Sequence, residues 1–155
     1  MLSFSRAIVL AGLAIMLCGC GEHPQATVEF SDAWTRETTA GVPVGAGYGV
    51  VRNNTARPIR LVSATSPAAN RIEIHTVVTD KGVMRMRPLA DGLEIPSGRE
   101  IALKPGGHHL MLIGLHRALR SGEVIPVAFE FEGAAAQTVG FHVRSVSAPQ
   151  GADHE

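Results

Sequence analysis

Histidine and methionine alternate at the start of one short apolar segment, where His109 and Met111 flank Leu110. Successive side chains of a strand point to opposite faces, so the imidazole and the thioether share one face while the leucines enter a core. The preceding Pro105-Gly106-Gly107 predicts a tight turn that determines where the pair emerges. The segment therefore predicts two soft, neutral ligand groups on one strand face.

A similar set of side chains lies upstream. His75 ends an alternating apolar segment, and Met84 and Met86 follow it across a turn that contains glycine. This hairpin predicts that the methionines return alongside His75. The spacing is His75, ten residues, Met86, twenty-two residues, His109, one residue and Met111. Imidazole together with thioether sulfur suits monovalent copper, whereas either methionine taken alone is better explained as a core filler.

The N-terminus has the pattern of an export signal. Arg6 precedes an apolar run over residues 7–17, which is too short for an ordinary membrane span. The run ends in Leu17-Cys18-Gly19-Cys20, which resembles a bacterial lipobox. We predict a lipoprotein signal peptide over residues 1–19, lipidation of Cys20 and an anchor and linker over residues 20–26. A plain cleaved signal peptide is the alternative. Either signal predicts export to the periplasm, and lipidation adds attachment to the inner or the outer membrane.

Composition excludes several classes of function. The 155 residues suffice for one domain, and the formal net charge of zero argues against nucleic-acid binding, which requires clustered Lys and Arg. Both cysteines lie in the N-terminal segment, so the domain offers no thiolate for a blue-copper electron-transfer site. The chain also has neither a Gly-x-Ser-x-Gly elbow nor a His-Glu-x-x-His zinc motif, and we expect no enzyme activity.

Short alternating segments separated by turn residues predict an all-β sandwich or barrel. One helical turn is expected over residues 114–121, and a loose tail over residues 147–155. The predicted domain covers residues 27–146. Its expected strands lie at residues 27–31, 45–51, 58–63, 72–78, 83–87, 101–103, 109–112, 127–132 and 139–143.

The region from about Val28 to Arg144 resembles the PCuAC family of periplasmic copper chaperones. The segments that carry the resemblance are Ala33-Trp34-Thr35-Arg36, Ala46-Gly47-Tyr48, Ser66-Pro67-Ala68-Ala69, Glu73-Ile74-His75, Gly82-Val83-Met84-Arg85-Met86-Arg87-Pro88, Leu93-Glu94-Ile95-Pro96-Ser97-Gly98 and Leu103-Lys104-Pro105-Gly106-Gly107 leading into His109-Leu110-Met111-Leu112. This resemblance implies a cupredoxin-like Greek-key β-sandwich that binds Cu(I). The ligands that it implies are His75, Met86, His109 and Met111. The partners that it implies are cytochrome c oxidase subunit II or Sco-type copper proteins.

The sequence departs from the family pattern in two places. The interval between Met86 and His109 is one residue longer than the usual twenty-one, and His108 stands where many members have an aromatic residue. His108 and Met84 are therefore auxiliary ligand candidates.

His23 and His154 offer only weak evidence for a second, Cu(II)-type site. General copper buffering or copper tolerance in the periplasm is the alternative to copper delivery.

Overall fold

The structure is a computed structural model that describes residues 27–145. All regular secondary structure in these residues is β, and none of their segments forms a helix that could cross a membrane. The strands are β1 (Val28–Arg36), β2 (Val44–Asn53), β3 (Ile59–Thr65), β4 (Ala69–Asp80), β5 (Val83–Pro88), β6 (Leu93–Ile95), β7 (Glu100–Leu103), β8 (His109–Leu115), β9 (Val124–Glu132) and β10 (Gln137–Arg144).

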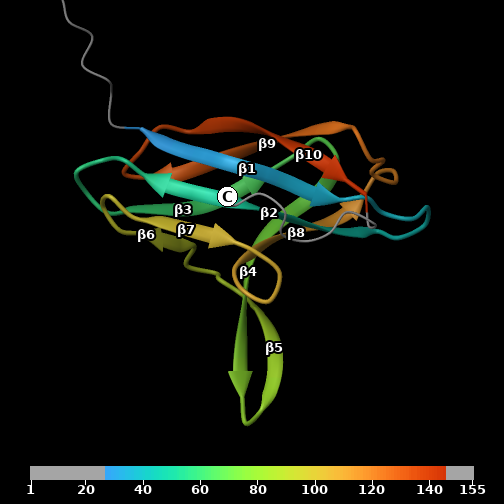
Figure 1. The fold of residues 1–155 in the computed structure, drawn as a ribbon, viewed down its shortest axis with the longest axis horizontal. Coiled ribbons are helices and arrows are strands. Elements are labelled where there is room, and N and C mark those ends of the chain that lie inside the picture. The colour runs from blue at the N-terminus through green and yellow to red at the C-terminus, as the bar shows by residue number, and fades with distance from the viewer. Residues whose placement is uncertain (1–26, 146–155) are drawn as a thin grey trace, which may run out of the picture.

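These strands form one continuous hydrogen-bonded sheet that curls into a barrel-like sandwich (Figure 1). Their order is β5-β4-β8-β2-β1-β10-β9-β3-β6, and β7 also pairs with β2. Strands that are consecutive in the chain, such as β3 and β4, are therefore far apart in this order. The predicted all-β sandwich is confirmed.

Alternating side chains build the core. Val127 and Phe129 on β9 are fully buried, whereas Glu130 between the aromatic positions is exposed. Phe129 stacks on Phe30 of β1 with ring centroids 4.4 Å apart, and Phe141 of β10 lies 6.0 Å from it. Burial of such aromatic side chains contributes most to the stability of a small sandwich.

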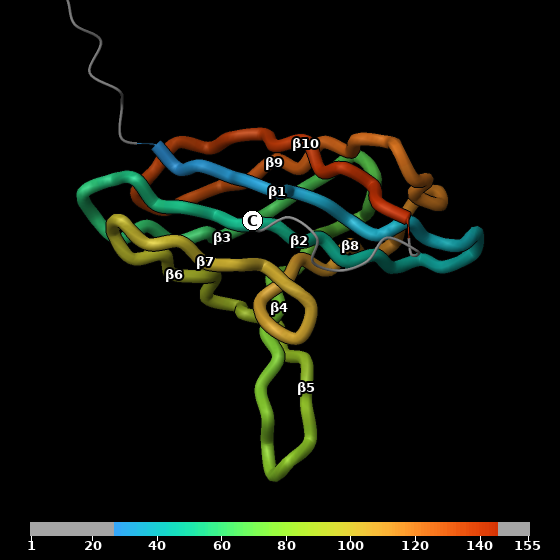
Figure 2. The backbone as a smooth tube through the Cα atoms, viewed as in Figure 1, coloured from blue at the N-terminus to red at the C-terminus, as the bar shows by residue number. Residues whose placement is uncertain are grey.

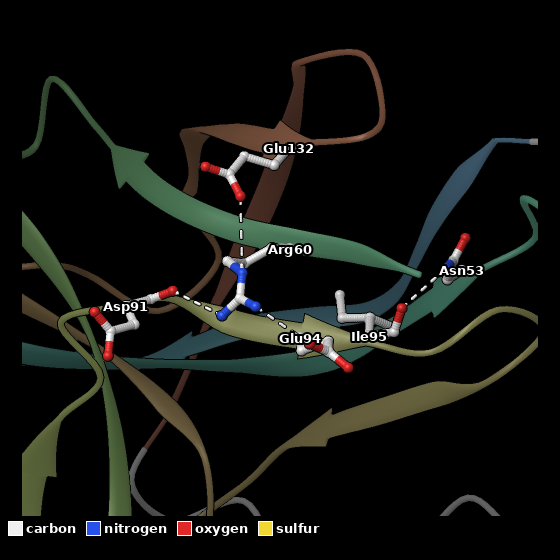
Figure 3. A network of polar contacts seen from close by, with 6 residues as sticks. All are labelled: Asn53, Arg60, Asp91, Glu94, Ile95 and Glu132. Carbon is white, nitrogen blue, oxygen red and sulfur yellow. Dashed lines mark hydrogen bonds and ion pairs between the residues drawn. The ribbon is translucent and has the colours of Figure 1, made fainter. Parts of the chain in front are cut away.

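A polar network at β3 holds the short strand β6 against the sandwich (Figure 3). The Arg60 guanidinium donates to the Asp91 carbonyl at 3.1 Å and pairs with Glu94 at 3.2 Å and with Glu132 at 3.7 Å. These groups are largely exposed, so each ion pair adds little to the free energy of unfolding. Arg60 therefore links β3 to Glu94 of β6 and to Asp91 just before β6, which is the last strand in the sheet order.

The buried Asn53 side chain at the end of β2 also contacts β6. Its amide donates to the Ile95 carbonyl at 2.9 Å and to the Arg57 carbonyl at 2.8 Å, while its oxygen accepts from the Thr55 amide at 2.9 Å. These bonds satisfy a polar group that has no exposure to water. Figure 3 shows the bond from Asn53 to Ile95.

Two consecutive strands share one edge of β2. Its residues 49–52 pair with β7 and its residues 44–47 pair with β8. The chain between β7 and β8 makes the predicted turn, in which the Gly107 amide donates to the Lys104 carbonyl at 3.0 Å. Gly106 has a φ of +76° at the third position, where a type II turn requires a positive value. This turn places His109 at the start of β8.

The hairpin formed by β4 and β5 projects from the sandwich (Figures 1 and 2). Its two-residue turn consists of Lys81 and Gly82, both with positive φ, as a type I′ turn requires. The inner part of β4 pairs with β8, whereas its outer part pairs only with β5. His75 is the residue at which β4 changes partners, so it lies where the hairpin leaves the sandwich.

The predicted helical turn over residues 114–121 is wrong. β8 extends to Leu115, and residues 116–120 follow without helical hydrogen bonds. The Leu119 amide donates instead to the Thr38 hydroxyl, and the Thr38 amide donates to the Leu119 carbonyl at 3.0 Å. Long-range bonds to the segment after β1 therefore replace the local bonds of a helix.

Candidate metal centre

One face of the β5-β4-β8 sheet presents the candidate ligands. His75 lies directly opposite His109, and Met86 lies opposite Val77, two residues further along β4. Directly opposed residues of antiparallel strands point to the same face. Met111 is two residues after His109 and therefore shares this face. The opposite face carries Ile74, Leu110 and Leu112, which are buried in the core.

His109 is held by the turn that precedes it. Its side chain is almost completely buried, and its Nδ1 lies 3.0 Å from the Gly107 carbonyl oxygen. A carbonyl oxygen only accepts hydrogen bonds, so Nδ1 carries the proton. In the neutral imidazole the lone pair is consequently on Nε2.

The Nε2 atom of His109 lies 3.1 Å from the sulfur of Met86. With the proton on Nδ1, neither atom has a hydrogen to donate, so two electron pairs face one another. A cation placed between them would convert this repulsion into coordination, and imidazole nitrogen with thioether sulfur suits Cu(I). This contact joins residues 23 positions apart in the chain.

His75 lies beside His109, with the ring centroids 5.8 Å apart in an edge-on arrangement. Its Nε2 is 2.8 Å from a carboxylate oxygen of Glu73, whose other oxygen accepts from Arg71 Nε at 2.9 Å. The Nδ1 atom of His75 is buried and has no hydrogen-bond partner among the described residues. A buried polar atom without a partner is costly unless a ligand engages it.

Met111 lies on the same sheet face, opposite Glu73 on β4 and Ala46 on β2. It also borders an open groove of about 480 Å³, which Tyr48, Pro105 and residues 36–39 help to line. The Tyr48 ring is 6.5 Å from the ring of His109, and burial raises the pKa of its hydroxyl. Met111 therefore connects the candidate metal centre to this groove.

The auxiliary candidates lie at the margins of the centre. Met84 shares the face of Met86 but pairs with Thr79, nearer the tip of the hairpin, and it is 64% exposed. His108 follows the turn over residues 104–107 and pairs with Leu103 in an isolated β-bridge, and its buried Nδ1 has no partner among the described residues. The predicted lipidation site Cys20 and the terminal histidines lie outside the described residues. Within residues 27–145, no three His, Cys, Asp or Glu side chains converge as a metal site.

Sequence reasoning assigned no role to Glu73 or to the Gly107 carbonyl, which contact the two candidate histidines. The signal for Glu73 is its spacing, because residues i and i+2 of a strand share a face and Glu73 therefore lies beside His75. A backbone carbonyl leaves no signal in side-chain types. Its position depends on the turn around Gly106.

One family model and one relative from another organism each match most of this chain. The family model described as "Putative lipoprotein LpqE-like" matches residues 28–143. A protein of Leifsonia xyli subsp. xyli named "Putative lipoprotein Lxx21020" is 33% identical over 152 residues, which cover 92% of this chain and 90% of that protein.

Two solved structures share the fold. The "Copper-bound PCuAC domain from PmoF2" has a TM-score of 0.64 at 21% identity, with 77% of this chain and 93% of that chain covered. The structure titled "Solution structure of CuI-DR1885 from Deinococcus Radiodurans" has a TM-score of 0.60 at 25% identity, with 84% of this chain and 85% of that chain covered.

Proposed function

The chain belongs to the LpqE-like family, and we propose that it is a copper chaperone that binds one Cu(I) ion. Its proposed ligands are His75, Met86, His109 and Met111. The proposal is supported by the shared sheet face of these residues and by the fold that the chain has in common with copper-bound PCuAC domains.

The contact between His109 and Met86 carries this proposal. A lone pair on Nε2 faces a thioether sulfur at 3.1 Å, and the proton that would bridge them is held elsewhere. The His109 side chain is buried, yet its Nε2 meets no hydrogen-bond donor in this contact, whereas buried polar atoms normally find hydrogen-bond partners. It is the arrangement expected of two ligands that await a soft cation.

The ligand chemistry fits transport better than catalysis. Two neutral imidazoles and two thioethers add no charge, so they favour Cu(I) over Zn(II) and Cu(II). His109 is buried, but Met86 is 59% exposed at the base of the projecting hairpin. An acceptor can therefore reach the sulfur first and take the ion by ligand exchange.

The copper recipient that we propose is the copper centre of cytochrome c oxidase, reached directly through subunit II or by way of Sco-type proteins. This part of the proposal rests on the resemblance of the chain to PCuAC proteins. We further propose that lipidated Cys20 anchors the protein to a membrane that faces the periplasm. The lipobox-like Leu17–Cys20 segment and the name of the related Leifsonia protein support this anchor.

Anaerobic titration of the full-length protein with Cu(I) tests the site. We expect one tight equivalent and an X-ray absorption spectrum with both nitrogen and sulfur scatterers. The double variant H109A/M111A should lose most of this affinity. His116→Ala is the control, because that exposed imidazole is hydrogen-bonded to the Pro67 carbonyl and to Asn70 outside the site.

Two results would contradict the proposed ligands. One is a Cu(I) spectrum without sulfur scatterers, and the other is a double variant that binds copper as tightly as the parent. Competition experiments with equal or stronger Zn(II) binding would contradict the proposed metal preference.

A further inference from the structure

We propose that Glu73 is a positioning residue for the copper site, whose carboxylate holds His75 so that Nδ1 is the nitrogen offered to the metal. This inference rests on the proposed function, because it assumes that His75 is a copper ligand. It goes beyond the proposed function by naming the residue that orients His75.

The hydrogen bond between Glu73 and His75 has a defined direction. The Arg71 guanidinium donates to one oxygen of Glu73 at 2.9 Å, and this pairing favours the ionised carboxylate. A carboxylate has no proton to donate, and the 2.8 Å contact therefore requires the proton on His75 Nε2. In the neutral ring, Nδ1 then carries the lone pair.

The surroundings of His75 Nδ1 agree with this assignment. The atom is buried and lacks a protein partner among the described residues, although the ring is fixed by its other nitrogen. A carboxylate that accepts from the distal nitrogen of a metal-bound imidazole fixes the tautomer and ring orientation and makes the ligand more basic. Glu73 is placed to do all three.

Glu73 itself is engaged elsewhere and does not compete for the ion. One carboxylate oxygen accepts from His75 and the other accepts from Arg71 at 2.9 Å. Glu73 lies opposite Met111 on the sheet, so an unpaired carboxylate here would add a hard oxygen beside a soft sulfur. Arg71 therefore helps to preserve the soft character of the site.

The two proposed histidine ligands consequently offer different nitrogens. The Gly107 carbonyl holds His109 by Nδ1 and leaves Nε2 free, whereas Glu73 holds His75 by Nε2 and leaves Nδ1 free. One ring is positioned by the backbone and the other by an acidic side chain. Only the latter can be removed by a single substitution.

Glu73→Ala and Glu73→Gln test the inference in the full-length protein, with Glu94→Ala as a matched control. Glu94 also pairs with an arginine on a strand, but it lies on β6 beside Arg60. Nitrogen NMR of the copper-free protein should place the His75 proton on Nε2 and show a slowly exchanging Nε2–H signal. That signal should be lost in E73A and kept in E73Q, whose amide oxygen still accepts.

Cu(I) competition titrations give the second readout. We expect E73A to weaken Cu(I) binding about 10- to 100-fold, which is typical for the loss of a residue that orients a ligand. E73Q should have a smaller effect, and E94A should match the parent. Thermal unfolding of the apo proteins shows whether the variants remain folded.

The positioning role is overturned if the apo parent carries the His75 proton on Nδ1, or if E73A binds Cu(I) as tightly as the parent. Failure of the proposed function gives a different result, because the parent itself would then bind no Cu(I) through His75. The NMR measurement on the copper-free protein is independent of that outcome.

Discussion

Exposure divides the proposed ligands into an inner and an outer set. His109 is 5% exposed and is held by a backbone carbonyl, whereas Met86 is 59% exposed and approaches it from the projecting hairpin. A buried, oriented ligand gives the site its geometry, and an exposed thioether gives an acceptor access to the ion. Met84 is exposed as well, but it lies one alternation further toward the hairpin tip.

Substitution of the two methionines of β5 by leucine separates their roles. Met86→Leu should weaken Cu(I) binding at least about tenfold, or roughly 1.4 kcal/mol, because it removes sulfur while it keeps the size of the side chain. Met84→Leu should leave the Cu(I) affinity within about twofold. Both side chains are exposed, so neither change should alter the free energy of unfolding by more than about 0.5 kcal/mol. Competition titration and chemical denaturation measure these effects. If both variants lose Cu(I) affinity equally, Met84 is also a copper ligand.

The turn over residues 104–107 is the element that orients His109. Gly106 adopts a positive φ in this turn, and the next residue supplies the carbonyl that fixes the His109 tautomer. A change in the backbone of this turn should therefore alter the orientation of His109 and weaken Cu(I) binding, even though no proposed ligand is substituted.

Gly106→Ala tests this coupling, with Gly98→Ala as the control. Their φ values are +76° and +68°, and an added Cβ would meet open space at either position. The conformational strain should therefore lower stability similarly, by about 1–2 kcal/mol in each variant. Only Gly106→Ala should also weaken Cu(I) binding, because only that turn orients His109. Denaturant unfolding and Cu(I) competition give the two measurements, and an equal effect on copper would show that strain acts on the whole fold.

The whole molecule combines a closed sandwich with one projecting hairpin. The described part of the chain buries its core within the sandwich, whereas every residue of β5 is exposed. In the proposed lipoprotein, the N-terminal anchor would hold this sandwich at a membrane and restrict the search for a membrane-bound copper acceptor. Delivery would then depend on both the copper site and the anchor.

A deletion strain tests delivery at the scale of the whole protein. Cytochrome c oxidase activity should fall at limiting copper and recover when copper is ample, because unassisted loading then suffices. The parent gene should restore activity fully. Cys20→Ser should move the protein from the membrane fraction to the soluble fraction and restore less activity at limiting copper. A normal oxidase at limiting copper would favour general copper buffering instead.

Several elements could be predicted from the sequence because they depend on near neighbours in the chain. Alternation with a period of two placed Leu110 and Leu112 in the core and His109 on the other face, as the structure confirms. The turn at Pro105-Gly106 and a hairpin turn within residues 79–82 also followed from local conformational preferences, although β4 extends to Asp80 and shortens the latter turn to Lys81 and Gly82. The helical turn expected over residues 114–121 failed because Leu119 bonds to a distant segment.

Residue types and short patterns in the chain were therefore sufficient to predict the type of fold, the chemical types of the proposed ligands and the faces on which individual strands carry their side chains. The packed strands were needed to show that His75 lies opposite His109, that Met86 reaches His109 Nε2 and that Glu73 engages His75. These contacts could not be predicted because they depend on interactions over long distances in the chain. Side-chain alternation and turn geometry act over a few residues, whereas strand register is set by how the whole apolar face packs, and register brings together atoms from residues 23 positions apart.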